Sequence, residues 1–450
     1  MRRIIAVWVT KFLILIGRLG GKGGSSTPGH FALKICPNIL KFLSGQVRDG
    51  IIAVCGTNGK TTTNNLLCTM LRAEGKKVVC NSLGANMLEG VVTAFASSAD
   101  LFGRLDADFA CIEIDEISAV KVFDHFIPKS MIITNLFRDQ LDRYGEIDIT
   151  VDYLKRAVEK AKNITLILNA DDPLVAAFGK KTGNPCVFFG VGEDVGISLN
   201  ETKEGRFCSF CGEELSYRFY HYSQLGDYGC GSCGFSRPEV RFEATEVNIS
   251  EGLSFNVDGR RIHADYRGFY NIYNILAAYS AASHAGAELK DLQSVLGGYK
   301  PQVGRMETFF IGKPVVFNLS KNPAGFNQAI SSVSGDGRSK DVVVVINDNA
   351  QDGRDISWIW DVDFERLKDV KAKTFTASGI RHCDVMVRFK YAGLENTKDT
   401  GDVLKAIEDA LKTDSEVLYV LVNYTALFST QKILKRLEGD YKSGKGGRWE

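Results

Sequence analysis

The chain has 450 residues, of which 44% are hydrophobic, so it is long enough for two or three domains with buried cores. Its 55 basic and 54 acidic residues leave a formal net charge of +1, which gives no bulk electrostatic reason to bind nucleic acid. Eleven cysteines in a chain of this length do not make the dense disulfide framework of a small secreted protein. They fit reduced thiols in a cytoplasm.

The first 24 residues begin with Met-Arg-Arg and continue with two apolar runs, Ile4–Thr10 and Phe12–Ile16, separated by Lys11. This order is similar to a signal peptide, but the lysine interrupts the apolar run and no small-residue cleavage site follows. Neither run approaches the roughly 20 residues of a membrane-spanning helix. Two interpretations stay open: an amphipathic helix packed on the body of the protein, or a helix lying on a membrane surface with Lys and Arg at the headgroups.

A phosphate-binding loop is predicted at Gly56-Thr57-Asn58-Gly59-Lys60-Thr61. The loop follows an apolar run, Ile51–Cys55, and precedes a helical pattern with an apolar stripe. The two glycines let backbone N–H groups approach phosphates, Lys60 can reach the β- and γ-phosphates, and the Thr61 hydroxyl can coordinate Mg²⁺. Val54 stands where the common motif has its first glycine, so an ordinary glycine turn is the alternative.

Strand and helix patterns then alternate, which predicts a mostly parallel sheet covered on both faces. The expected strands are Val78–Cys80, Asp108–Ile114, Met131–Thr134 and Leu166–Leu168, with a helix near residues 151–162. Polar residues follow these strands, at the edge where such sheets bind ligands. They are Asn81, Glu113, Asp115, Glu116, Asn135, Asp139 and residues 169–172. Several carboxylates that converge beside a phosphate loop favour a Mg²⁺ site.

Cys208-Ser-Phe-Cys211 and Cys230-Gly-Ser-Cys233 form two Cys-x₂-Cys pairs separated by 18 residues. Each pair can close a tight turn on one metal, and two pairs complete a tetrahedral thiolate shell. We expect a structural zinc ribbon at residues 205–236. Four thiolates leave no open coordination position, so no catalysis is assigned to this site, and four free thiols or an iron–sulfur site are the alternatives.

Further elements complete the predicted architecture. Three antiparallel strands are predicted at Val240–Val247, Leu253–Val257 and Arg261–Tyr266, with Asp258-Gly259 as a hairpin turn. Helices are expected to follow at 271–285 and 289–296. The last third predicts a smaller, Rossmann-like α/β domain. Its expected strands are Val315–Asn318, Val342–Ile346, Thr374–Thr376, Val385–Arg388 and Val417–Leu421, with a closing helix at 426–437 and a frayed tail at 442–447.

The combined motifs resemble the Mur ligases, which use ATP to form an acyl phosphate on a carboxylate and then an amide. The similarity rests on the phosphate loop, Glu113, Thr134-Asn135, Asp139-Gln140-Leu141-Asp142 and Asn169-Ala-Asp-Asp-Pro173. It continues with Gly268-Phe-Tyr-Asn271-Ile-Tyr-Asn274, Val303-Gly-Arg305-Met-Glu307 and Asn318-Leu-Ser-Lys321-Asn-Pro323. The resemblance implies domains at 46–306 (central, ATP-binding, with the cysteine insert) and 307–450 (C-terminal), after an N-terminal helical segment at 1–45.

The chain also departs from most Mur ligases. Gln140 stands where a metal-binding His is usual, Tyr270 and Lys321 also replace His, and only about 45 residues precede the ATP-binding strand. That is too few for the usual domain that grips a UDP-linked sugar. These departures resemble the MurT group of the family, the ATP-using subunits of lipid II isoglutaminyl synthases. The resemblance implies a heterodimer with a glutamine amidotransferase subunit similar to GatD.

The resemblance also implies the reaction and its residues. The α-carboxylate of D-glutamate in the lipid II stem peptide would become an acyl phosphate, and ammonia from the partner would convert it to an amide. Lys60, Glu113 and Asp355 are the expected catalytic residues, with Mg²⁺ on Thr61 and Glu113. Asp355 can complete a Cys–His pair of the partner, because the scattered histidines of this chain suggest no such pair of its own. The expected ATP-binding residues are Gly56, Thr57, Asn58, Gly59, Lys60, Thr61, Thr62, Asn271, Asn274 and Arg305.

Two other functions are compatible with the same residues. A folylpolyglutamate-synthase-like ligase also lacks the large N-terminal domain, but it would attach an amino acid and need no partner. A nucleotide-binding scaffold would bind ATP and turn nothing over. The predicted location is the cytoplasm, at the inner face of the membrane if the N-terminal helix contacts lipid.

Overall fold

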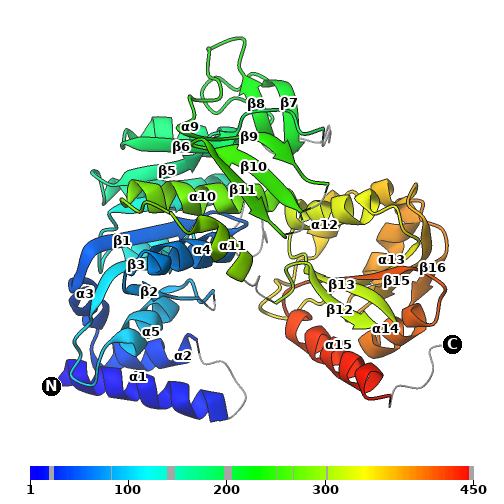
Figure 1. Ribbon diagram of the computed structural model, residues 1–450, viewed down its shortest axis with the longest axis horizontal. Coiled ribbons are helices and arrows are strands. Elements are labelled where there is room, and N and C mark those ends of the chain that lie inside the picture. The colour runs from blue at the N-terminus through cyan, green and yellow to red at the C-terminus, as the bar shows by residue number, and fades with distance from the viewer. Residues whose placement is uncertain are drawn as a thin grey trace. The chain divides into compact units, whose positions relative to one another are not determined.

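The computed structural model describes residues 1–19, 25–82, 84–138, 147–196, 205–250, 252–266, 268–299 and 303–444. These residues form two compact units (Figure 1). One unit contains residues 1–137 and 147–299, and the other contains residues 303–444 together with Arg138. Residues 303–306, placed at the end of the central domain in the sequence analysis, therefore group with the second unit. Each unit is described by itself.

The first unit is built on a nine-stranded sheet with the order β11-β10-β9-β6-β5-β4-β1-β3-β2. Strands β1 to β6 and β9 pair in parallel, and β10 and β11 extend the sheet as antiparallel strands. The bounds are β1 (Val47–Cys55), β2 (Val78–Cys80), β3 (Ala107–Glu113), β4 (Ser130–Ile133), β5 (Thr165–Asn169), β6 (Cys186–Val191), β9 (Phe242–Asn248), β10 (Leu253–Val257) and β11 (Arg260–Ala264).

Helices cover this sheet and form an N-terminal layer beside it (Figure 1). They are α1 (Arg2–Leu19), α2 (Thr27–Ile35), α3 (Ile39–Ser44), α4 (Lys60–Ala73), α5 (Leu88–Ser98), α6 (Ala119–Val122), α8 (Ile147–Glu159), α9 (Pro173–Thr182), α10 (Tyr270–His284) and α11 (Leu292–Gly298). The predicted N-terminal helix is confirmed as α1, which packs against α2 and α5 and buries Ala6, Val7 and Thr10. No helix in the described part of the chain has the length and hydropathy needed to cross a bilayer.

The strand order predicts a ligand-binding position at the carboxyl end of β1. Its neighbours are β3 on one side and β4 on the other, so the order of the chain reverses there. In open parallel sheets, ligands bind outside the carboxyl ends of the strands at such a reversal. The buried apolar side chains of β1 fix it in the centre of the sheet, which brings the glycine-rich loop to this point.

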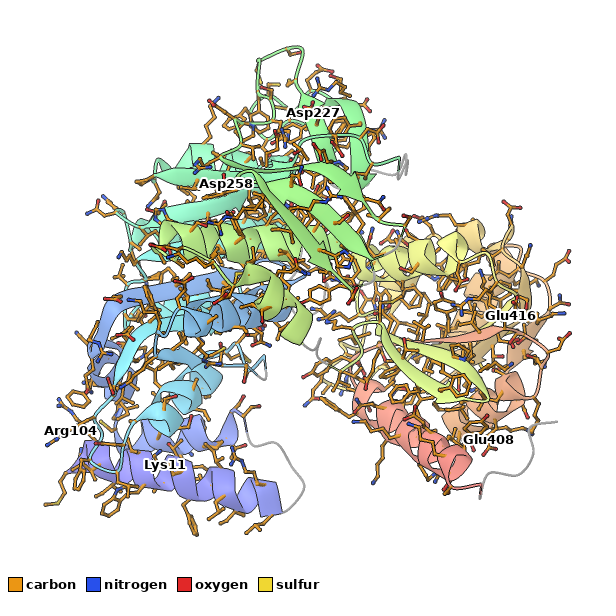
Figure 2. All side chains as sticks on the ribbon, viewed as in Figure 1. Lys11, Arg104, Asp227, Asp258, Glu408 and Glu416 are labelled. Atoms are coloured by element: carbon orange, nitrogen blue, oxygen red, sulfur yellow. The ribbon has the colours of Figure 1, made fainter. Side chains whose placement is uncertain are left out.

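The predicted hairpin at Asp258-Gly259 is confirmed between β10 and β11, with Asp258 labelled in Figure 2. Both residues have positive φ, 49° and 72°, as the tight primed turns require. A separate hairpin, β7 (Ser216–Tyr222) and β8 (Leu225–Gly229), belongs to the cysteine-containing insert.

The second unit is a six-stranded sheet with the order β12-β13-β17-β14-β15-β16. Only its edge strand β12 is antiparallel. The strands are β12 (Glu307–Ile311), β13 (Lys313–Leu319), β14 (Lys340–Val345), β15 (Ala372–Ser378), β16 (Thr397–Asp399) and β17 (Val417–Val422). The helices are α12 (Pro323–Gly335), α13 (His382–Tyr391), α14 (Val403–Leu411) and α15 (Leu427–Lys442), with 3₁₀ turns η1 (Ser357–Asp361) and η2 (Phe364–Leu367). Apolar clusters on both sheet faces confirm the predicted α/β class.

Two predictions in this unit are wrong. Val385–Arg388 was expected as a strand but lies inside α13. Val385 and Phe389, four residues apart, are buried while Val387 is 47% exposed, which is helical rather than alternating periodicity. Lys442, expected in a frayed tail, is the last residue of α15. Residues 445–447 of that predicted tail lie outside the described residues.

Candidate functional site

The glycine-rich loop has the backbone shape that phosphate binding requires. Gly56 and Gly59 have φ of 118° and 85°, a region that other residues rarely adopt. A Cβ on Gly56 would lie 2.2 Å from Thr134 Oγ1, and one on Gly59 would lie 2.1 Å from Asn274 Oδ1. The loop therefore has room only for glycine at both positions, and it ends at the N-terminus of α4, where N–H groups favour an anion.

The segment after β4 holds the loop in place. Asn135 accepts a hydrogen bond from the Asn58 N–H at 2.8 Å and donates one to the Asn58 carbonyl at 3.1 Å. The Thr57 hydroxyl donates to the Phe137 carbonyl at 3.0 Å and accepts from the Phe137 N–H at 2.9 Å. These reciprocal bonds fix the loop before any ligand binds, because both sides of the crevice belong to one hydrogen-bonded network.

Lys60 is buried and paired with Glu116. Its ammonium lies 2.9 Å from Glu116 Oε1 and donates to the Gly56 carbonyl at 2.5 Å. The same carboxylate oxygen accepts the Gly56 N–H at 2.9 Å. Burial raises the pKa of Glu116, and the positive charge of Lys60 opposes that rise. The sequence analysis placed Glu116 only among the carboxylates that favour a Mg²⁺ site, and it did not predict the pairing with Lys60.

Glu113 and Thr61 face a common space beside Gly84. Glu113 Oε1 accepts a hydrogen bond from Asn86 at 2.9 Å, whereas its buried Oε2 has no hydrogen-bond partner among the described residues. A Cβ on Gly84 would lie 3.4 Å from Thr61 Oγ1 and 3.7 Å from Glu113 Oε2. A hydroxyl and an unpaired buried carboxylate oxygen are suitable ligands for Mg²⁺. Asp139 and Gln140, considered for the same metal, lie outside the described residues.

The structure places the other predicted ATP-binding residues in both units. Asn274 of α10 contacts Gly59 and donates to Asn271 Oδ1 at 2.9 Å, so this helix borders the phosphate loop. Thr62 follows Thr61 in the first turn of α4. Arg305 belongs to the second unit and follows Gly304, which has a positive φ of 71°.

Asp355 lies two residues before the short helix η1 of the second unit. Its Oδ1 accepts the Ser357 N–H at 2.8 Å, which is a capping contact. Hydrogen bonds from the Ser357 N–H and hydroxyl lower the pKa of Asp355. Farther back in the same loop, Asp352 is anchored on Thr425, whose N–H it accepts at 2.8 Å and whose hydroxyl it also binds. The loop is therefore held at the carboxyl ends of β14 and β17.

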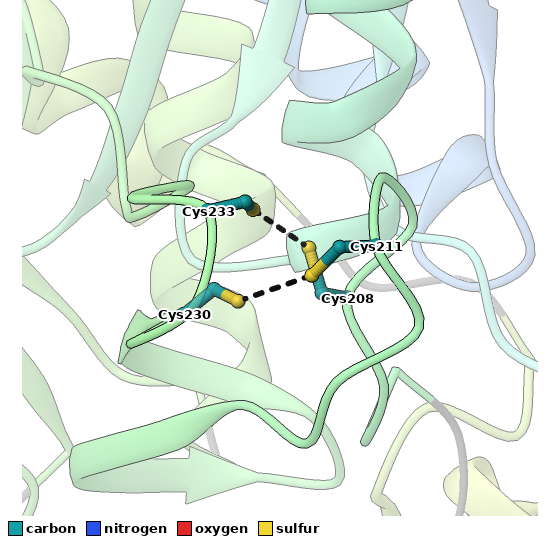
Figure 3. Close-up of side chains that lie close together, drawn as sticks. All are labelled: Cys208, Cys211, Cys230 and Cys233. Carbon is teal, nitrogen blue, oxygen red and sulfur yellow. Dashed lines mark hydrogen bonds between the residues drawn. The ribbon is translucent and has the colours of Figure 1, made fainter.

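The four predicted cysteines converge (Figure 3). The sulfur atoms of Cys208 and Cys233 are 3.5 Å apart, as are those of Cys211 and Cys230, and all four lie within 4.8 Å of one another. Each Cys-x₂-Cys motif closes the same turn. The Gly212 N–H donates to the Cys208 carbonyl, and the Gly234 N–H donates to the Cys230 carbonyl. Tetrahedral coordination with metal–sulfur bonds of ~2.3 Å places sulfurs about 3.8 Å apart, so the arrangement can hold a metal ion.

The cysteine insert contacts the segment that holds the glycine-rich loop through β7 and the turn after it. His221 is fully buried and its Nδ1 lies 2.6 Å from the Tyr273 hydroxyl, which donates to Asp171 at 2.7 Å. Burial lowers the pKa of His221. Gln224, also fully buried, donates to the Leu136 carbonyl at 2.7 Å. Sequence reasoning gave neither side chain a role.

One contact was not expected from the sequence. Cys383 Sγ lies 3.7 Å from His382 Nδ1, and the same nitrogen lies 2.5 Å from Asp399 Oδ1. The histidines were expected to be scattered, and this pair lies at the start of α13 in the second unit. The other ring nitrogen, Nε2, lies 3.9 Å from Cys383 Sγ, so Asp399, His382 and Cys383 are in contact in the order in which a carboxylate orients a histidine beside a thiol.

The chain matches two known domain families and is similar in sequence to proteins of known name. Residues 54–282 match the Mur ligase middle domain, and residues 319–427 match the MurT ligase C-terminal domain. The chain is 36% identical to the MurT subunit of lipid II isoglutaminyl synthase (glutamine-hydrolyzing) from Staphylococcus aureus strain COL, over 88% of this chain and 89% of that protein. It is 35% identical to the same subunit from Streptococcus pneumoniae strain ATCC BAA-255 / R6, over 93% and 94%.

Solved structures show the same fold. A pseudomurein peptide ligase type C from Methanothermus fervidus aligns with a TM-score of 0.70 at 24% identity, covering 92% of this chain and 86% of that one. MurF from Acinetobacter baumannii aligns with a TM-score of 0.66 at 14% identity, covering 91% and 80%. The predicted Mur-ligase-like fold is thus confirmed. The chain belongs to the Mur ligase family of ATP-dependent ligases and, within it, to the MurT group.

Proposed function

We propose that the chain is the ATP-using subunit that amidates the α-carboxylate of D-glutamate in the stem peptide of lipid II, giving D-isoglutamine. The observation that supports it best is the unpaired Glu113 carboxylate oxygen beside Thr61, at the end of a preformed phosphate loop. The named function of the relatives, which match about nine-tenths of the chain, supports the substrate and the reaction.

The chemistry proceeds in two steps. A carboxylate oxygen of the substrate attacks the γ-phosphorus of ATP, the bond to the β-phosphate oxygen breaks, and ADP leaves. Ammonia then attacks the acyl-phosphate carbonyl carbon, inorganic phosphate leaves, and the nitrogen loses a proton. The loop N–H groups and Lys60 stabilise the charge on the phosphates, because they are fixed in a buried site.

The buried oxygens fit a Mg²⁺ ion. Thr61 and Glu113 would hold it, and when bound it would neutralise phosphate charge. We also propose that Cys208, Cys211, Cys230 and Cys233 hold a structural zinc ion. The cluster packs against α9, with Cys208 and Cys230 buried beside Ala176 and Ala177. A thiolate-bound metal there would therefore stabilise the insert rather than take part in the reaction.

Ammonia would come from a separate subunit that hydrolyses glutamine, similar to GatD, in a heterodimer. The relatives are named as subunits of a glutamine-hydrolysing enzyme, which implies such a partner. Asp355 is proposed as the residue that this chain offers to the partner's glutaminase centre or to the acceptor. Because the substrate is a lipid, we place the reaction at the cytoplasmic face of the membrane.

Lys60→Ala provides the test. The chain and its partner would be incubated with lipid II, ATP and glutamine, and the product would be followed by mass spectrometry together with ADP release. We expect Lys60→Ala to lower turnover by at least about 100-fold, because charge stabilisation at the phosphates is lost. The exposed Lys76, which pairs with Asp49 on the surface, is the matched control and should leave turnover unchanged when replaced by Ala.

Three results would decide against the proposal. Full activity of Lys60→Ala would reject the phosphate site. Addition of glutamate to a folate by the chain alone would favour the folylpolyglutamate-synthase-like alternative. ATP binding without ADP formation, in the presence of lipid II, glutamine and the partner, would favour a scaffold.

A further inference from the structure

Helix α1 exposes an apolar stripe on the side opposite its buried face. The buried residues Ala6, Val7 and Thr10 lie on one side of the helix, at the contact with α2 and α5. Six large apolar side chains recur at helical spacing on the other side and are exposed: Ile5, Trp8, Phe12, Leu15, Ile16 and Leu19. Because these positions repeat every three or four residues, the stripe is continuous over the whole helix.

A neighbouring turn extends this surface. The Trp8 indole N–H donates to the Leu101 carbonyl at 2.7 Å, so the turn before β3 lies beside the first half of the stripe. Leu101 and Phe102 in that turn are also exposed. Figure 2, which labels Lys11 on α1, shows side chains projecting from this outer face. Contiguous apolar surface of this kind on a folded unit marks an interaction site.

The charged side chains of α1 are all basic. Residues 1–48 contain eight basic residues and no acidic residue, although the whole chain is balanced at +1. On the helix, Arg2 lies at one edge of the stripe and Lys11 and Arg18 at the other, as 3.6 residues per turn dictates. Basic side chains that flank an apolar face are typical of helices that lie in the interface of an anionic membrane.

We infer that the outer face of α1, with Leu101 and Phe102, binds the surface of an anionic lipid bilayer, parallel to it and without crossing it. This inference rests on the proposed function for its purpose: the helix would hold the enzyme at the surface where a lipid-linked substrate lies. A second copy of the chain is a poor occupant, because two surfaces with the same positive charge would repel each other.

Co-sedimentation of the full chain with vesicles, without substrate or nucleotide, tests the inference. The vesicles contain phosphatidylcholine either alone or mixed with phosphatidylglycerol. The wild type should bind the mixed vesicles, bind pure phosphatidylcholine more weakly, and lose affinity in high salt. The double variant Phe12→Glu, Leu15→Glu should lose at least about tenfold in partitioning, because two inserted apolar side chains are replaced by charges that anionic lipid repels.

Phe428→Glu is the matched control, because Phe428 is 63% exposed on α15 of the second unit and Phe12 is 61% exposed. It should bind vesicles like the wild type. No binding of the wild type to the mixed vesicles, or equal binding by the double variant, would overturn the inference. A wild-type dimer that the double variant converts to a monomer, with no binding to vesicles, would also overturn it and identify a second copy as the occupant.

Turnover separates this inference from the proposed function. With the partner subunit present, the double variant should amidate detergent-solubilised lipid II at the wild-type rate and lose rate on lipid II in vesicles. If the wild type amidates nothing but still binds mixed vesicles, the proposed reaction is rejected and the inference that α1 binds lipid is kept. If the double variant loses vesicle binding but matches the wild type on both forms of the substrate, the surface binds lipid without serving substrate access, and that purpose is rejected.

Discussion

The side-chain amide of Gln224 donates a hydrogen bond of 2.7 Å to the backbone carbonyl of Leu136, across 88 residues of sequence. Leu136 lies in the segment after β4 that holds Thr57 and Asn58 of the phosphate loop. Its own N–H donates to Asp172 at 2.8 Å. Gln224 follows β7 in the cysteine insert, so a hydrogen-bonded path links the insert to the glycine-rich loop.

Gln224→Ala should therefore weaken nucleotide binding as well as the fold. The change leaves the buried Leu136 carbonyl without its donor, which costs roughly 1–3 kcal/mol of unfolding free energy. We expect KM for ATP to rise more than kcat falls, because the loop is displaced while the reacting groups remain. Denaturant unfolding and ATP-dependent turnover measure the two effects.

Gln431→Ala is the control for that variant. Gln431 is a buried glutamine of the second unit that donates to Glu307 at 2.9 Å. Its loss should reduce stability by a similar amount and leave KM for ATP unchanged. An equal rise of KM in both variants would mean that general destabilisation, and not the path through Leu136, weakens binding.

Glu113→Gln tests the metal ligand. The amide can still accept the hydrogen bond from Asn86, but it removes the negative charge at the unpaired oxygen. We expect turnover at fixed Mg²⁺ to fall by roughly 100-fold or more, and the Mg²⁺ concentration for half-maximal rate to rise. Glu243, a half-exposed carboxylate that pairs with Arg237, should change neither quantity when replaced by Gln. An unaltered Mg²⁺ titration of Glu113→Gln would remove Glu113 from the metal site.

Asp172 should make stability depend on pH. Burial raises the pKa of Asp172 to about 6, against 3.8 ordinarily, although it accepts the N–H groups of Leu136 and Leu174. A folded-state pKa above the unfolded value gives stability that is present below pH ~4 and lost as the pH rises through ~6. The unfolding free energy of the wild type minus that of Asp172→Asn should therefore fall between about pH 4 and pH 7.

Asp106→Asn is the control for the loss of a surface carboxylate, because Asp106 is exposed and paired with Lys77. Its unfolding free energy is measured over the same pH range. The unfolding free energy of the wild type minus that of Asp106→Asn should stay constant between about pH 4 and pH 7 and fall only as the pH drops below about 4, because the Lys77 and Arg48 hydrogen bonds lower the pKa of Asp106. A difference for Asp172→Asn that rises with pH would show that the two N–H groups outweigh burial.

Metal analysis of protein purified without chelator should find about one zinc per chain. The double variant Cys208→Ser, Cys230→Ser should lose it and unfold more readily, because both sulfurs are buried against α9. Cys383→Ser, at an exposed thiol outside the cluster, should retain full zinc. Full zinc in the double variant, or iron in place of zinc in the wild type, would reject the proposed structural zinc site.

The sequence predicted most of the sheet because buried parallel strands are continuous apolar runs. β2 has the predicted bounds, and β1 extends the predicted run by four residues at its start. The antiparallel strand β10 also has the predicted bounds, because its buried and half-buried residues alternate. The same signal failed at Val385–Arg388, where a short apolar run lies in an amphipathic helix. The phosphate loop and the cysteine pairs were visible because their spacing is local. The pairing of Lys60 with Glu116, and of Gln224 with Leu136, depends on contacts between distant elements, which local patterns do not specify.

Asp355→Asn separates a capping role from a functional one. Asn is about as good a cap as Asp, so the contact with the Ser357 N–H and the stability should be kept. Loss of one member of a catalytic triad, or of a positioning group, typically costs ~10²–10⁴-fold in rate. We expect a rate loss in that range with little change in unfolding free energy, measured for the chain with its partner.

The nitrogen source locates the defect. A loss only with glutamine, and none with added ammonium, would assign Asp355 to the glutaminase centre, whereas a loss with both would assign it to the ligase centre. Cys383→Ser, which removes the thiol beside His382, should keep glutamine-dependent activity, because the nucleophile is expected in the partner. Wild-type rates of Asp355→Asn on both nitrogen sources would show that Asp355 only caps η1, and loss of glutamine-dependent activity in Cys383→Ser would move the glutaminase residues into this chain.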